Sequence, residues 1–155
     1  MAAVRVMLVD DFKQWRATVR SIVEAMEGFR VVAEAGDAVE AIEKAGRLLP
    51  DIVLLDIGLP RLNGIEAAPR IRRTSPGSKI IFLTQEYDSD VTAAAFATGA
   101  EACLLKSQVV RELRRTIVAA RQIPSRHLRR EHGEDPYPDQ RPRLPELHLE
   151  ESNQS

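Results

Sequence analysis

Three aspartates stand directly after short apolar runs of the chain and could share one cation. Asp10 and Asp11 follow the run Val4–Val9, and Asp56 follows Ile52–Leu55. Crowded carboxylates repel and raise one another's pKa, and a hard divalent cation such as Mg²⁺ relieves this repulsion. A single aspartate at such a place is commonly a turn residue or a helix N-cap. All three together favour a metal site.

A hydroxyl and an ammonium end two further apolar runs. Thr84 closes Lys79–Leu83, and Lys106 closes Ala102–Leu105. Facing three acids, these groups would make a phosphoryl site, in which the metal and Lys106 neutralise charge and Thr84 donates a hydrogen bond. All three histidines lie beyond residue 125. Ser–His catalysis and histidine-rich zinc sites are therefore excluded from the earlier part of the chain.

A parallel sheet would bring these residues together. Five short apolar runs, including Val31–Glu34, alternate with amphipathic stretches, and several of the runs are apolar on consecutive residues. Such runs are typical of strands covered on both faces. We predict an α/β fold, a (βα)5 doubly wound parallel sheet. In the strand order 2-1-3-4-5 typical of this pattern, Asp10, Asp11 and Asp56 converge where the order reverses.

Turn residues mark the expected ends of the helices. Gly28 follows the first amphipathic stretch, Leu49-Pro50 ends the second, and Ser75-Pro76-Gly77 ends the third. Asn63 is a candidate N-cap for the third helix. Pro69 lies about six positions into that helix, past the first turn where proline is tolerated. We therefore expect either a kink there or a later helix start.

The chain has room for one ordinary domain and a tail. Of its 155 residues, 44% are hydrophobic, which is enough for a core. The last 32 residues, from Pro124, hold five of the nine prolines, many charges and no apolar periodicity. We expect residues 1–123 to form the domain and residues 124–155 to be a disordered tail. This tail is too short and too rich in proline for a helix-turn-helix, so no DNA-binding output domain is expected.

Composition narrows the class of protein. The 22 Lys and Arg against 23 Asp and Glu give a net charge of −1, which argues against a strongly basic nucleic-acid binder. Cys103 is the only cysteine, which suits a reducing compartment. No apolar run approaches the ~20 residues of a membrane span, and the N-terminus lacks a signal-peptide pattern. We expect a cytoplasmic protein without membrane contact.

Between Val4 and Gln122, the chain resembles the receiver domains of two-component response regulators. The stretches that carry the resemblance are LVDD ending at Asp11, LLDIGLPRLNG from Leu54 to Gly64, FLT ending at Thr84, and GAEACLLK from Gly99 to Lys106. Lys106 is followed by Ser107 where many receivers have proline. This ending is similar to receivers that usually carry a C-terminal helix-turn-helix. The resemblance implies a flavodoxin-like fold.

The resemblance also implies a mechanism. Asp56 would accept a phosphoryl group from a sensor histidine kinase or a phosphotransfer protein. The implied site is Asp10, Asp11, Asp56 and the Gly58 carbonyl for Mg²⁺, with Asp56, Thr84 and Lys106 acting on the phosphoryl group. Such a domain is not an enzyme, although it assists its own phosphorylation and dephosphorylation. It acts through contacts with a downstream protein, and it could form a weak homodimer.

Cys103 departs from the family pattern. Receivers usually place Tyr or Phe three residues before the lysine, and this ring turns inward when the threonine moves. A small thiol cannot fill that volume, so we predict that phosphorylation occurs but changes the segment Asp90–Gly99 only weakly. A small buried hydrophobe is a simpler interpretation of Cys103 than a redox sensor. Trp15, on the apolar face of the first helix, is expected to be a core residue.

Two other functions stay open. A metal-dependent phosphatase of the haloacid-dehalogenase type also forms an aspartyl-phosphate. It requires a second Asp two residues after the nucleophile, where this chain has Gly58, and it usually carries a capping insertion. A pseudo-receiver would only bind a partner, which the intact Asp56, Thr84 and Lys106 disfavour.

Overall fold

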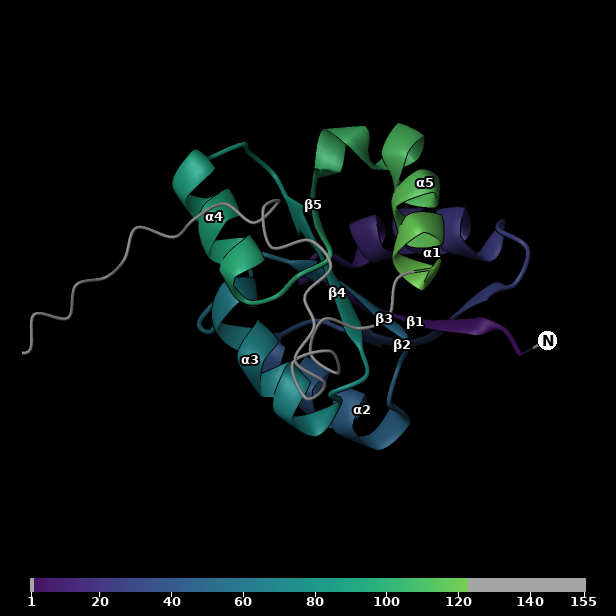
Figure 1. The fold of residues 1–155 in the computed structure, drawn as a ribbon, viewed down its shortest axis with the longest axis horizontal. Helices are drawn as coiled ribbons and strands as arrows, with labels where there is room; N and C mark the ends of the chain where they lie inside the picture. The colour runs from purple at the N-terminus through teal and green to yellow at the C-terminus, as the bar shows by residue number, and fades with distance from the viewer. Residues whose placement is uncertain (1, 123–155) are drawn as a thin grey trace, which may run out of the picture.

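A parallel sheet forms the centre of the domain (Figure 1). The computed structural model describes residues 2–122, so the predicted tail at 124–155 lies outside the described residues. The strands are β1 Val4–Val9, β2 Phe29–Ala35, β3 Ile52–Asp56, β4 Lys79–Thr84 and β5 Ala102–Leu105. They pair in the order β2-β1-β3-β4-β5, all parallel. The predicted fold and strand order are confirmed, and β2 is longer at both ends than its apolar run suggested.

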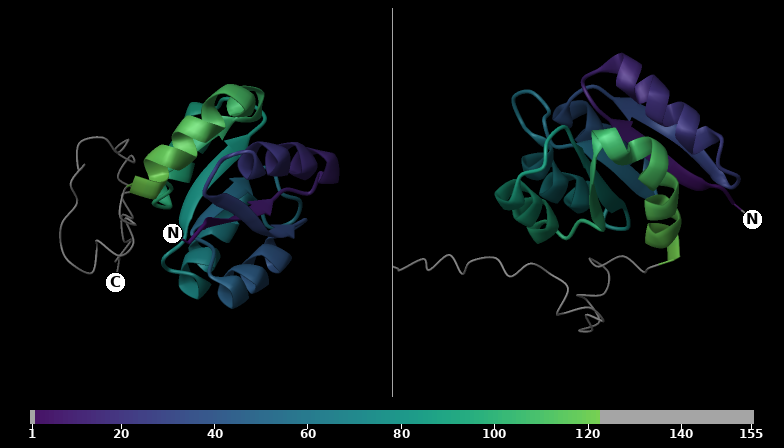
Figure 2. Two further views of the ribbon diagram at one scale, coloured as in Figure 1. Left: turned by 90° about the vertical axis from the view of Figure 1, so that its right-hand side faces the viewer. Right: turned by 90° about the horizontal axis from the view of Figure 1, so that it is seen from above.

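Helices cover both faces of this sheet (Figures 1 and 2). They are α1 Lys13–Glu24, α2 Ala38–Leu48, α3 Gly64–Thr74, α4 Ser89–Ala97 and α5 Val109–Gln122, with a 3-10 turn at Lys106–Gln108 before α5. Helices α1 and α5 lie on one face, and α2, α3 and α4 on the other. Within residues 2–122, every helix is too short or too polar to cross a lipid bilayer.

The central strands contribute to a hydrophobic cluster on each face. In β3, Ile52 and Leu54 pack in the cluster under α1 and α5, while Val53 and Leu55 pack in the cluster under α2 and α3. Successive side chains of a strand point to opposite faces, so a strand buried on both faces must be apolar at every position. Each buried Leu, Ile or Val stabilises the fold by roughly 1.5–3 kcal/mol. The scaffold is therefore held by these two layers.

Local signals set the start of α3, which follows the loop after Asp56. The Asn63 side chain accepts a hydrogen bond from the Glu66 amide at 2.9 Å, and the Glu66 carboxylate accepts from the Asn63 amide at 3.3 Å. This capping box confirms Asn63 as the N-cap. The helix then runs through Pro69, so the alternative of a later start is wrong. Pro69 lies on the exposed side, where water can satisfy the carbonyl that proline leaves without a partner.

Candidate functional site

The acids predicted to share a metal meet at the carboxyl edge of the sheet. Asp10 and Asp11 follow β1, Asp56 ends β3, and β1 pairs directly with β3. One carboxylate oxygen from each of these three residues lies within 4.8 Å of the others. Asp10 and Asp56 are buried and Asp11 is exposed. Such a set of hard oxygen donors, open to water on one side, could hold a divalent cation.

Lys106 reaches these acids from β5, the edge strand next to β4. It follows β5, and its ammonium lies 2.6 Å from Asp10 Oδ2 and 3.5 Å from Asp56 Oδ1. The ammonium also lies over the ring of Trp15, 5.5 Å from the ring centroid. Sequence reasoning placed Lys106 in the site but gave no sign of its contact with Trp15, because the two residues are far apart along the chain.

The electrostatics of the site disfavour a charged Asp56. Burial raises the pKa of the Asp56 carboxyl, and the neighbouring Asp10 carboxylate raises it further. The Gly58 amide, which donates to Asp56 Oδ1 at 3.0 Å, and the Lys106 ammonium both act against this rise. The net pKa lies above the ordinary aspartate value. An added cation at this edge would therefore stabilise the ionised form.

The loop between β3 and α3 is shaped around Asp56. The Gly64 amide donates to the Ile57 carbonyl at 2.9 Å, which folds the start of α3 back on the end of β3. A Cβ at Gly64 would lie 2.2 Å from the backbone carbonyl oxygen of Asp56. Gly64 ends the stretch LLDIGLPRLNG, whose pattern alone does not reveal a role for this glycine. Its role is to let the helix approach the strand end.

A cavity of about 580 Å³ opens over the acids. Besides the three aspartates, Gly58 and Lys106, its lining includes Phe12, Trp15, Gln85 and Ser107. Thr84 is not among the described residues that line it. Its hydroxyl donates instead to the Glu86 carbonyl at 3.2 Å. The structure thus brings together all the predicted site residues except the Thr84 hydroxyl, which is engaged elsewhere.

The residue at the expected aromatic position is a partly buried thiol. Cys103 lies in β5 opposite Phe82 of β4 and packs against the cluster under α2 and α3. Burial raises the pKa of the Cys103 thiol, so the reactive thiolate is disfavoured. This environment agrees with the interpretation of Cys103 as a small hydrophobe, although it is half-buried.

Trp15 lies between the core and the site. It is partly buried and packs against the cluster under α1 and α5, so it borders the core and does not lie within it. It also lines the cavity over the acids. Its indole N–H is buried and has no hydrogen-bond partner among residues 2–122. Trp15 is therefore a natural reporter of changes at the acids.

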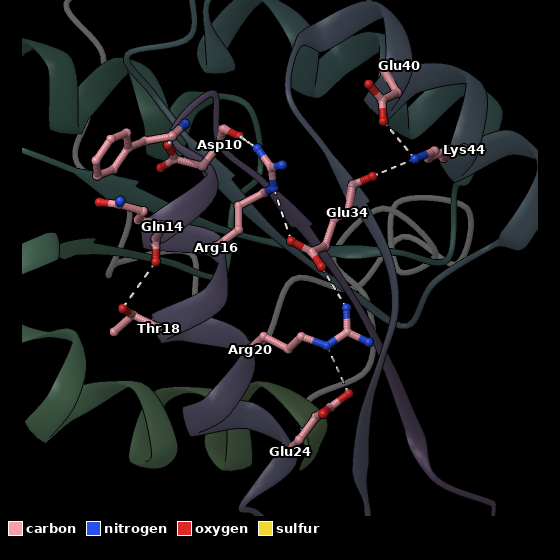
Figure 3. A network of polar contacts seen from close by, with 10 residues as sticks. Asp10, Gln14, Arg16, Thr18, Arg20, Glu24, Glu34, Glu40 and Lys44 are labelled. Carbon is pink, nitrogen blue, oxygen red and sulfur yellow. Dashed lines mark hydrogen bonds and ion pairs between the residues drawn. The ribbon is translucent and has the colours of Figure 1, made fainter.

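Arg16 is a residue of the site region that the sequence analysis missed. Its guanidinium donates to the backbone carbonyl of Asp10 at 2.6 Å and to the Glu34 carboxylate at 3.0 Å (Figure 3). An arginine on an amphipathic helix normally indicates a solvated face, so no sequence signal distinguishes this one.

Known proteins resemble this chain in sequence and in fold. The family profile described as response regulator receiver domain matches residues 6–118. The transcriptional regulatory protein LiaR of Bacillus subtilis is 35% identical over 117 residues, which are 76% of this chain and 56% of LiaR. The nitrate/nitrite response regulator protein NarP of Escherichia coli is 39% identical over 102 residues, which are 66% of this chain and 47% of NarP. The chain thus spans about half the length of these curated relatives.

Solved structures of response regulators have the same fold. The receiver domain of the putative response regulator NarL from Mycobacterium tuberculosis superposes with a TM-score of 0.72 at 26% identity, over 79% of this chain and 100% of that one. A LuxR-family two-component response regulator from Aurantimonas sp. gives a TM-score of 0.69 at 33% identity, over 86% of this chain and 100% of that one. The similarity to transcriptional regulators agrees with the predicted placement among receivers that usually carry a helix-turn-helix.

Proposed function

Because the chain belongs to the response regulator receiver domain family, we propose that Asp56 accepts a phosphoryl group in two-component signalling. The observation that supports this is the grouping of three carboxylates within 4.8 Å, with the Lys106 ammonium 3.5 Å from Asp56 Oδ1. Acids that could hold a cation, a buried acceptor carboxylate and a nearby ammonium are the parts that phosphoryl transfer to a carboxylate uses.

Mg²⁺ is the cofactor that these donors fit best. Asp10, Asp11, Asp56 and the backbone carbonyl of Gly58 would hold it, and it would supply charge neutralisation for the transferring oxygens. Burial raises the pKa of Asp56, and the Asp10 carboxylate raises it further. A bound cation would offset both effects by stabilising the ionised carboxylate.

Each side chain then has a defined part in the transfer. The Asp56 carboxylate attacks the phosphorus of a phosphohistidine in line, so that a P–O bond forms while the P–N bond breaks. Lys106 turns from Asp10 to pair with a phosphoryl oxygen, and the Thr84 hydroxyl leaves the Glu86 carbonyl to bond another. Hydrolysis of the acyl phosphate restores Asp56. In this proposal the chain is a phosphoacceptor that assists its own phosphorylation and dephosphorylation, and it does not act on other substrates.

This role defines the partners. The phosphoryl donor would be a sensor histidine kinase or a phosphotransfer protein, and the output would pass through contact with a downstream protein or a weak homodimer. A histidine kinase partner and a single cysteine together suit the cytoplasm. We take residues 1–123 as the receiver unit.

Intact-mass spectrometry after incubation with acetyl phosphate and Mg²⁺ tests the proposal. We expect a gain of one phosphoryl mass that is absent in Asp56→Asn and in EDTA. Asp51→Asn is the matched control, because Asp51 lies at the other end of β3 and its side chain accepts from the Arg5 amide, which asparagine can also do. No gain in the wild type, with no phosphate released, would indicate a pseudo-receiver. Phosphate release without a phosphorylated form would indicate a phosphatase.

A further inference from the structure

A polar network connects the acidic turn after β1 to β2 (Figure 3). Arg16, one helical turn into α1, is only 16% exposed at its side chain. One guanidinium nitrogen, Nη1, donates to the backbone carbonyl of Asp10 at 2.6 Å, and Nε donates to Glu34 Oε1 at 3.0 Å. The planar guanidinium thus bridges a backbone oxygen of the site and a carboxylate outside it. Lysine cannot reproduce this two-point contact.

Glu34 is itself held from two sides. Its second carboxylate oxygen accepts from Arg20 Nη1 at 2.6 Å, and its backbone carbonyl accepts from Lys44 Nζ at 2.6 Å. Lys44 in turn pairs with Glu40 at 2.6 Å, which ties this end of β2 to α2 (Figure 3). Burial raises the pKa of Glu34, but hydrogen bonds from Arg20 and Arg16 outweigh this and bring it below the ordinary value. The Glu34 carboxylate is therefore charged and fixed in place.

The network acts on the backbone of Asp10, one of the three acids of the site. The Asp10 amide donates to the Ala35 carbonyl at 3.0 Å, and Asp10 Oδ1 accepts from the Phe12 amide at 2.9 Å. The carbonyl of Asp10 is the remaining backbone group of this residue, and Arg16 holds it. Because this carbonyl belongs to the peptide that joins Asp10 to Asp11, its orientation sets the direction in which both side chains leave the backbone.

We infer that Arg16, oriented by Glu34, is a positioning residue that fixes the Asp10–Asp11 peptide so that both carboxylates face the cation site. The inference rests on the proposed function. Glu34 has a second effect, because its carboxylate engages the Arg16 guanidinium. Released from Glu34, Arg16 could turn to the Asp10 or Asp11 carboxylate and take the place of the metal. Removing either partner should therefore weaken Mg²⁺ binding, and outer-shell partners of metal ligands typically contribute about 10-fold or more in affinity.

Isothermal titration calorimetry with MgCl2 on the full chain tests the inference. We expect Arg16→Met and Glu34→Gln each to raise the Mg²⁺ Kd by about 10-fold. The double variant should be no weaker than the worse single variant, because the two residues act through one contact. Arg16→Lys should behave like Arg16→Met. Arg47→Met is the control, because Arg47 forms an ion pair with Glu43 on α2 that involves neither Glu34 nor Asp10. The Mg²⁺ Kd of this variant should stay within about twofold of the wild-type value.

Urea unfolding in EDTA separates positioning from general stability. A purely structural role would lower the free energy of unfolding of Arg16→Met and leave the Mg²⁺ Kd unchanged, and this result would overturn the inference. An equal loss of affinity in Arg47→Met would also overturn it, because general loss of charge would then explain the effect. Glu34→Gln keeps the shape of its side chain and carries the test if Arg16→Met does not fold. If the wild-type protein binds Mg²⁺ and is phosphorylated, and the variants bind Mg²⁺ equally well, only this inference is overturned. If the wild-type protein binds no Mg²⁺, the proposed function is overturned as well.

Discussion

Gly64 and Asp56 approach so closely that no side chain fits between them. A Cβ at Gly64 would lie 2.2 Å from the carbonyl oxygen of Asp56, and this neighbour is backbone that cannot turn aside. The first residue of α3 therefore constrains the strand end that carries the acceptor carboxylate. A substitution of Gly64 would therefore affect the chemistry at Asp56 through the Asp56 backbone, without contact with a substrate.

Gly64→Ala should consequently impair both stability and phosphorylation. We expect a loss of about 1–3 kcal/mol in the free energy of unfolding, typical of overpacking, and slower phosphorylation because the Asp56 backbone must move. Urea unfolding and the intact-mass assay measure these two effects. Gly77→Ala is the matched control, since a Cβ there meets nothing within 4 Å. It should be neutral or stabilising by about 0.4–1 kcal/mol. Equal behaviour of the two variants would contradict the steric argument.

Asp56→Asn should stabilise the metal-free protein at neutral pH. The folded state binds the Asp56 proton more tightly than the unfolded chain does, because burial and Asp10 raise its pKa. Ionising this carboxyl at neutral pH therefore costs stability, and the neutral amide avoids that cost. The advantage of the variant should be full above the raised pKa and should shrink as the pH falls toward the ordinary aspartate value. Urea unfolding in EDTA over this pH range measures it, and a variant less stable than wild type at pH 7 would refute the argument.

Trp15 fluorescence should respond to Mg²⁺. The Lys106 ammonium lies over the Trp15 ring and pairs with Asp10, so a cation that engages Asp10 will shift the charge next to the indole. A fluorescence titration with MgCl2 measures the response, and Asp11→Asn, which removes an exposed ligand, should weaken it. An unchanged spectrum in a sample whose Mg²⁺ binding is established by calorimetry would show that Lys106 does not move.

The effect of phosphorylation on α4 should be small. Cys103 replaces the usual aromatic ring, so a movement of the Thr84 hydroxyl away from the Glu86 carbonyl would have no bulky side chain to draw inward. Amide-shift mapping by NMR with beryllofluoride and Mg²⁺ should show changes near Asp56 and Thr84 but little across Asp90–Gly99. Cys103→Tyr should enlarge the response on that segment. Large shifts there in the wild-type protein would contradict this prediction.

The fold could be predicted from sequence because its signals are local. Consecutive apolar residues in strands such as Ile52–Leu55 indicate burial on both faces, and alternation with helices then leaves few topologies. The acids could be placed because they directly follow strand ends, whose positions the topology sets. Pro69 suggested either a kink in α3 or a later helix start. The later start is wrong, because the Asn63 capping box and the burial of Ala67 and Ile71 outweigh the lost hydrogen bond.

The remaining features depend on side-chain reach, which leaves no pattern in a sequence. Arg16 contacts a backbone carbonyl, a group that every residue has, so neither its type nor its spacing reveals the contact. The Lys106–Trp15 pair joins residues from opposite ends of the domain. The direction of the Thr84 hydroxyl is a rotamer choice that spacing does not fix.

The two hydrophobic clusters include none of the three acids at the sheet edge. The acids add local hydrogen bonds and ion pairs at this edge, such as those of Asp10 with the Phe12 amide and with Lys106, while the apolar layers hold the fold together. Evolution could therefore remove the chemistry by substituting these acids while the two apolar layers stay in place. An inactive descendant would keep its shape and its surface, and it would persist as a protein that competes for the same partners.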